Sequence, residues 1–213
     1  LNREIIALEN KLLGLQDLDR KYVGFSESVR IVLEAHAGGE KSLRGLKGLM
    51  ANIIDVPAGM ELAVEVAAGK GLENIVVAAA ADAREAIYFL KRKGLGRVTF
   101  LPLDSLRVQK LNPRIIKELG QREGVLGLAS QLLNYDPQFE KAVEYLLGRV
   151  LLVSDLDRGM QIYKQSQLPL RIVSLDGEII NVSGAMTGGV MNRHKSSPLQ
   201  RKGAVRKLEQ QMQ

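Results

Sequence analysis

Residues 50–77 read MANIIDVPAGMELAVEVAAGKGLENIVV, and residues 129–154 read ASQLLNYDPQFEKAVEYLLGRVLLVS, a second version of the same pattern. Both versions place an apolar pair before Asp or Asn, then a proline, and then a helical stretch that contains Ala-Val-Glu. The triplet begins at Ala63 in the first copy and at Ala142 in the second. Such an internal repeat predicts that one structural unit occurs twice in the chain.

Each copy continues through a buried strand, a second helix and another strand that ends near an Asp, Asp104 or Asp176. This alternation predicts an α/β (α+β) fold of two lobes, each of mixed sheet and helices, related by a pseudo-twofold axis. We expect lobe I over 22–110 and lobe II over 111–190, with a polar crossover at 103–114. The expected strands are 74–78, 97–101, 150–154 and 171–175, and the expected helices are 58–68, 82–93, 137–147 and 155–166.

Both ends of the chain carry apolar residues at heptad spacing, which is typical of coiled coils. They are Leu1, Ile5, Leu8, Leu12 and Leu15 at one end, and Val205, Leu208 and Met212 at the other. We expect coiled-coil stubs at 1–21 and within a basic segment at 191–213, lying antiparallel with Leu8 or Leu12 facing Leu208. Two heptads are fewer than the three or four that identify a coiled coil, so ordinary amphipathic helices packed on the domain are the alternative.

The composition of the 213 residues excludes several kinds of site. Without Cys there is no disulfide, zinc–thiolate site or Cys nucleophile, and the two His residues have no carboxylate spacing that suggests a metal. The nearest phosphate-loop match, AGGEKS at 37–42, has Glu40 where the motif requires Gly. We expect no enzymatic activity, no metal and no cofactor here. No apolar run approaches the ~18 residues of a membrane span, so no membrane partner is expected.

Charge is distributed unevenly. Thirty Lys and Arg residues against 24 Asp and Glu give a formal charge of +6, yet no acidic residue occurs between Glu178 and Glu209. That stretch predicts contact with a polyanion, and a merely solvated surface is the alternative. Its cations are Arg193, Lys195, Arg201, Lys202, Arg206 and Lys207.

The segment SGAMTGGVMN at 183–192 contains Gly184, Gly188 and Gly189. A phosphate site is disfavoured because the glycines do not open a helix after a strand. A glycine-rich turn that ends lobe II is one interpretation. The other is an edge strand without bulky side chains, which lets a partner chain pair closely with it.

Taken together, these features resemble the hinge domain of SMC (structural maintenance of chromosomes) proteins, most of all the bacterial homodimeric kind. The resemblance covers nearly the whole chain. It rests on YVGFSESVRIVLEA (22–35), GLKGLMANIIDVPAGMELAVEVAAGKGLENIVV (45–77), AREAIYFLKRKGLGRVTFLPLD (83–104), DPQFEKAVEYLLGRVLLVSDLDRG (136–159) and SLDGEIINVSGAMTGG (174–189).

The resemblance implies a module that joins two antiparallel coiled-coil arms of a chromosome condensation and segregation ATPase, whose heads lie elsewhere. The first residue is Leu and not Met, so we expect a piece of such a longer protein. The resemblance also implies a ring-shaped homodimer in which an edge of lobe I meets lobe II of the other copy, at the motif matching Gly184, Gly188 and Gly189.

Sequence-independent DNA binding near the arm junction is implied as well, with Arg193, Lys195, Arg201 and Lys202 in the matching stretch and Arg206 and Lys207 along the arm. The implied location is the cytoplasm, at the nucleoid. Dimerisation without DNA binding is the alternative function. An enzyme on duplicated lobes is a third possibility, which the missing catalytic motifs disfavour.

Overall fold

The two copies of the repeat build two sheets with the same plan. In the computed structural model, which describes residues 2–166, 168–190 and 197–211, each sheet starts with an antiparallel pair followed by a parallel strand. Lobe I has the strand order β1 (Leu46–Leu49), β2 (Ile75–Val77) and β3 (Phe100–Pro102). Lobe II repeats it as β4 (Val125–Leu128), β5 (Val150–Val153) and β6 (Arg171–Ser174), and adds the antiparallel strands β7 (Ile179–Ile180) and β8 (Met186–Thr187).

The first strand of each sheet has the same irregularity. The pairing register shifts at Gly48 in β1 and at Gly127 in β4, where the backbone φ angles are +156° and +138°. Glycine tolerates such angles at low cost, and a bulge turns the strand toward the short helix that follows it. The duplication therefore includes the position of the bulge in the backbone. The sequence prediction placed no strand at 46–49 or 125–128.

The helices also occur in matching pairs. After the first strand comes α3 (Met50–Ile53) or α7 (Ala129–Leu132), then α4 (Glu61–Ala68) or α8 (Glu140–Leu147), and after the second strand α5 (Ala80–Arg92) or α9 (Leu156–Ser166). The remaining helices of the lobes are α2 (Glu27–Ala37) and α6 (Pro113–Gly120), and short 3-10 turns cover Lys41–Leu43, Gly69–Glu73 and Pro137–Phe139. The four predicted helices and four predicted strands are confirmed with shifts of a few residues.

A two-residue bridge marks the pseudo-twofold axis. Asp55 N donates to Asn134 O at 2.8 Å, and Asn134 N donates to Asp55 O at 2.9 Å. These two residues occupy equivalent places in the repeat, with the same separation as Ala63 and Ala142. Reciprocal hydrogen bonds between equivalent residues are what a local twofold axis produces.

The lobes share one apolar core. Helix α4 of lobe I packs against β6 and α8 of lobe II, which buries Ala63, Val64 and Ala67. Core residues of both lobes, among them Val76 and Leu152, belong to one continuous cluster. A second, smaller cluster lies within lobe II and includes Leu119, Leu151 and Ile172. The lobes are therefore structural repeats that depend on each other for burial.

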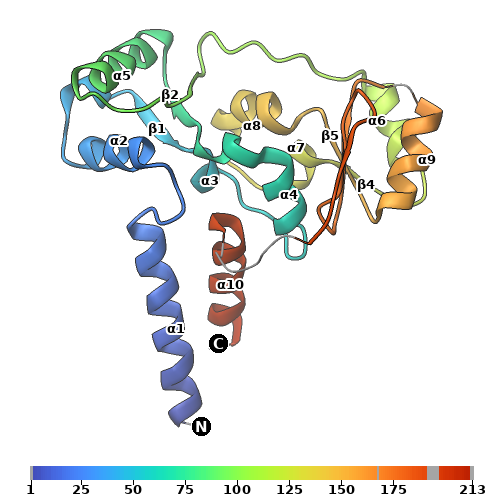
Figure 1. Cartoon of the computed structure of the whole chain (residues 1–213), viewed down its shortest axis with the longest axis horizontal. Helices are drawn as coiled ribbons and strands as arrows, with labels where there is room; N and C mark the ends of the chain where they lie inside the picture. Colours follow the sequence, from blue (N-terminus) through green and yellow to red (C-terminus); the bar gives the residue numbers. More distant parts are fainter. Residues whose placement is uncertain (1, 167, 191–196, 212–213) are drawn as a thin grey trace.

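Two helices at the chain ends project together from one side of the lobes (Figure 1). Helix α1 (Asn2–Arg20) runs toward the lobes and α10 (Pro198–Gln211) runs away from them, and the two are in contact. We call them the helix pair. Their antiparallel arrangement confirms the predicted hairpin-tip geometry. Helix α1 lies within the predicted stub at 1–21, and α10 lies within the predicted basic segment at 191–213. Among the described residues, no helix has the length and apolar character needed to cross a bilayer.

Candidate functional site

The glycine-rich segment forms the outer edge of the lobe II sheet. Strand β8 pairs with β7 on one side, and among the described strands none lies on its other side. Met186 in this strand is 53% exposed, Val182 before it is 54% exposed, and Val190 after it is 99% exposed. An edge strand with exposed apolar side chains is a ready site for pairing with another strand. Met186 and Thr187 thus form an edge strand, and the pairing of a partner chain with it stays a prediction.

Hydrogen-bond alternation shows which backbone groups this edge offers. Asn181 N donates to Ala185 O at 2.8 Å, and the register pairs Ile180 with Met186 and Ile179 with Thr187. In an antiparallel ladder, every second residue directs its N–H and C=O away from its neighbour. Met186 therefore presents its N–H and C=O outward from β8.

The three glycines differ in what they do within the chain. Gly184 has φ +85°, and a Cβ there would lie 2.7 Å from the Tyr163 hydroxyl, so the hairpin turn itself requires glycine. Gly189 has φ +125° with open space around it, and a Cβ at Gly188 would lie 3.0 Å from Glu178 Cγ. Bulky residues at all three positions would strain the hairpin, so such a variant does not test an interface cleanly.

The lobe I sheet also ends in an uncovered strand, β3. Strand β3 takes the place in lobe I that β6 takes in lobe II, and the outer side of β6 is covered by β7. No strand among the described residues covers the outer side of β3. Pro102 at its end lacks an N–H, which is usual only at sheet edges. Among the described residues, β3 and β8 are therefore open edges of their sheets, and β1 and β4 form the opposite edges.

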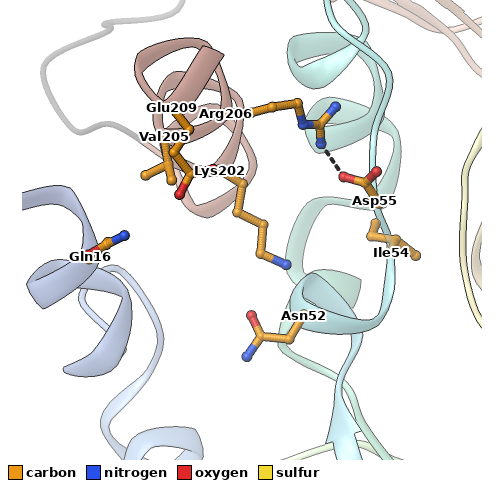
Figure 2. A pocket seen from close by; sticks show the side chains of 8 residues that line it. All are labelled: Gln16, Asn52, Ile54, Asp55, Lys202, Val205, Arg206 and Glu209. Carbon is orange, nitrogen blue, oxygen red and sulfur yellow. Dashed lines mark hydrogen bonds and ion pairs between the residues drawn. The ribbon is translucent and has the colours of Figure 1, made fainter. Parts of the chain in front are cut away.

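The predicted DNA-binding cations of α10 lie mostly against the protein. Arg201 is only 2% exposed, and it donates from Nη2 to Val23 O at 2.6 Å, under the turn between α1 and α2. Lys202 donates from Nζ to Ala51 O at 2.5 Å. Arg206 donates to Val56 O at 3.1 Å and forms an ion pair with Asp55 (Figure 2).

These contacts correct the interpretation of the basic segment. Arg201 is too buried to reach a phosphate, and Lys202 and Arg206, which are partly buried, hold α10 to lobe I. Lys207 is exposed on α10. Arg193, Lys195 and His194 lie outside the described residues. Another basic cluster, Lys91–Lys93, lies exposed at the end of α5 and just beyond it, where Arg92 donates to Ser42 Oγ at 3.3 Å.

The start of α10 is also fixed by a polar contact that the sequence did not indicate. The Ser197 hydroxyl bonds to the Glu65 carboxylate on α4, and Gln200 N donates to Ser197 Oγ at 3.2 Å, as in a helix N-cap. Burial raises the pKa of Glu65, while the hydrogen bond from Ser197 and the charge of Arg201 lower it, and the net shift is upward. This contact could be found from sequence only by knowing that residues 65 and 197 meet.

Within the described part of the chain, no three His, Cys, Asp or Glu residues are placed to hold a metal ion. The open sheet edges present outward-directed backbone groups, and Lys207 adds an exposed cation on α10. Such surfaces suit binding of a macromolecule.

The chain is similar in sequence to proteins of one family. A family model described as the flexible hinge domain of SMC proteins matches residues 43–163. The chain is 34% identical to "Chromosome partition protein Smc" of Desulfitobacterium hafniense over 99% of this chain and 17% of that protein. It is 33% identical to the protein of the same name from Bacillus subtilis, over 92% of this chain and 16% of that protein. The chain thus spans less than a fifth of these relatives.

Two solved structures that resemble this chain are also SMC hinge domains. An asymmetric dimer of the Geobacillus stearothermophilus SMC hinge domain matches with a TM-score of 0.89 and 32% identity, over 99% of this chain and 82% of that one. The Pyrococcus furiosus SMC hinge domain matches with a TM-score of 0.63 and 27% identity, over 89% of this chain and 93% of that one.

Proposed function

The chain belongs to the SMC hinge family, and from this premise we propose that it is the homodimerisation module of a longer chromosome partition protein. In this proposal the helix pair continues into two antiparallel arms, and the ATPase heads lie elsewhere in the full-length protein. The module works in the cytoplasm at the nucleoid, where the chromosome that such a protein partitions is located.

The observation that carries the dimer proposal is the open β8 edge with its outward Met186 amide and exposed Val182 and Val190. In the proposed dimer, β8 of one copy pairs with the uncovered side of β3 in the other copy. Two such contacts, related by twofold symmetry, close a ring. A dimer is also the state named for the Geobacillus hinge structure.

Met186→Pro tests this pairing. Proline removes the outward N–H of Met186 and leaves the hydrogen bonds between β7 and β8 in place, because those come from neighbouring residues. We expect the wild-type chain to sediment as a dimer, the Met186→Pro variant as a monomer and the control Met186→Ala as a dimer. A Met186→Pro variant with native circular dichroism that remains fully dimeric contradicts the proposed edge.

We propose sequence-independent DNA binding as a second role, with dimerisation alone as the alternative. What supports it is the acid-free stretch with Arg193 and Lys195 and the exposed Lys207, together with the chromosome partition role in the names of the relatives. Binding through phosphates weakens as salt rises, by roughly 0.7–0.9 in log affinity per contact for each unit of log salt. Replacing Arg193, Lys195 and Lys207 by Gln tests whether these cations contribute to that slope.

A further inference from the structure

A cleft of about 510 Å³ on lobe II gathers three arginines from three separate parts of the chain. Arg107 comes from the crossover between the lobes, Arg149 from the turn between α8 and β5, and Arg171 from the start of β6. Tyr145 and Val182 also line the cleft, and Glu144 is its one acidic residue.

The fold holds Arg149 and Arg171 next to each other. Arg171 N donates to Arg149 O at 3.0 Å, at the start of the parallel pairing between β5 and β6. The Arg171 side chain is oriented further by its bond from Nη1 to Ala67 O at 3.1 Å. Like charges that line one cleft repel each other, and an anion bound between them relieves that repulsion.

Arg107 is held at the rim of the same cleft by contacts on both sides of it. Before it, Lys141 Nζ donates to Leu103 O at 2.9 Å, and after it Lys110 forms a 2.6 Å ion pair with Glu140. Both contacts fasten the crossover to α8. The backbone around Arg107 is therefore positioned before any ligand arrives, which lowers the entropy cost of binding.

Charge balance distinguishes this cleft from two other clefts of the described structure. Among the described residues, no hydrogen bond or ion pair reaches the side chains of Arg107 and Arg149, and both are exposed. The cleft beside the helix pair instead contains Asp55 and Glu209 with its two cations, and the cleft beside α2 contains Glu34 and Glu40 with its two. The arginine cleft has an excess of two positive charges, which calls for an anionic ligand.

We propose that the Arg107–Arg149–Arg171 cleft binds the phosphate groups of a nucleic-acid strand, which gives the module a DNA contact away from the helix pair. This inference rests on the proposed DNA-binding role and gives it a location. Planar guanidinium groups bind phosphate oxygens in pairs, and three of them around one cleft match successive phosphates better than scattered lysines do. In Figure 1 the crossover 103–112 runs along the side of the lobes away from α10, so this contact can be tested separately from the basic segment.

The experiment compares the full chain with Arg107→Gln/Arg149→Gln and with a matched control, Lys47→Gln/Lys70→Gln. Lys47 and Lys70 are exposed cations outside the cleft, so both variants lose the same charge. Arg171 is kept because its bond to Ala67 O supports the fold. Binding of a labelled DNA duplex, of its single strand and of inorganic tripolyphosphate is measured across a salt series, with sedimentation as the check on assembly.

We expect the arginine variant to bind DNA roughly tenfold or more weaker at low salt, with a salt slope lower by roughly 1.4–1.8, while the control stays close to wild type. Equal DNA affinity of the two variants overturns the cleft as the contact and leaves the DNA-binding role itself in place. If wild type binds tripolyphosphate and neither DNA form, the cleft takes a small phosphate ligand and the strand assignment is wrong. If wild type binds none of the three, this inference fails together with the DNA-binding role, and the dimer proposal is unaffected.

Discussion

At the scale of single residues, Glu65 is where burial and charge compete most directly. Its carboxylate lies between α4 and the start of α10, bonded by the Ser197 hydroxyl and close to Arg201. Desolvation outweighs both favourable partners and raises its pKa above the ordinary value of 4.5. A raised pKa means that the folded state binds the proton more tightly than the unfolded state, so this group stabilises the fold less as pH rises through the folded pKa.

Glu65→Gln should therefore change the pH dependence of stability. Glutamine still accepts the Ser197 bond but carries no charge to desolvate. Relative to wild type, we expect the unfolding free energy of the variant to increase as pH rises above the ordinary carboxyl pKa of 4.5 and through the raised pKa of Glu65. Urea unfolding of both proteins at matched pH values measures this difference. A variant that loses stability relative to wild type over that range would show that the attraction to Arg201 dominates instead.

The sequence prediction that the cations of α10 bind DNA was wrong for Arg201 because tertiary contacts bury it. Arg201, Lys202 and Arg206 belong to a run without acidic neighbours in sequence, yet they bond to carbonyl groups of residues about 150 or more positions away. Local charge patterns contain no information about such distant carbonyl partners. The cleft of Arg107, Arg149 and Arg171 was missed for the converse reason, since its cations are far apart in sequence.

At the scale of elements, the two helices of the pair are attached to the lobes very differently. Helix α10 packs on α4 and is bonded to lobe I through Arg201, Lys202 and Arg206. Helix α1 contacts α10 and joins α2 through a turn in which Tyr22 has φ +51° and Gly24 has φ +98°. Short helices without tertiary contacts are marginal in water.

Hydrogen exchange should reveal this difference. We expect amides of residues 8–18 in α1 to exchange faster than those of residues 201–208 in α10, because α1 opens without breaking bonds to the lobes. Arg206→Gln should narrow the gap by releasing α10 from Val56 O and Asp55. Mass spectrometry of proteolytic peptides after timed labelling measures both. Equal protection of the two helices in the wild-type protein would contradict the assigned asymmetry.

Elements with strong periodicity could be predicted from sequence, and short ones could not. The 13-residue α5 and the buried β5 carry clear signals. Strands β1 and β4 are interrupted by Gly48 and Gly127, and β7 and β8 have two residues each, which is too short for an alternating pattern. That β8 is an edge was predictable from its glycines, whereas the open side of β3 became visible only once the lobes were compared.

At the scale of the whole molecule, the shared core makes the two lobes one folding unit. Helix α4 would expose Ala63, Val64 and Ala67 without lobe II. We expect a single urea transition with coincident far-UV circular dichroism and tyrosine fluorescence, and we expect residues 22–110 alone to remain largely unfolded. Two separated transitions, or a folded 22–110 fragment, would show that the repeats are independent domains. In a dimer, the transition midpoint also rises with protein concentration.

The placement of α1 beside α10, with both outer ends on the same side, has a mechanical consequence. A tension that pulls those ends apart acts across the helix pair, so it breaks the contacts between α1 and α10 a few at a time, starting from the outer end. Peeling of this kind needs far less force than sliding strands past one another, because the load falls on few contacts at once. The sheets are loaded only after the peel reaches the turn at Tyr22 and the bonds of Arg201 and Arg206. Under such tension the two helices therefore separate before the two lobes are loaded.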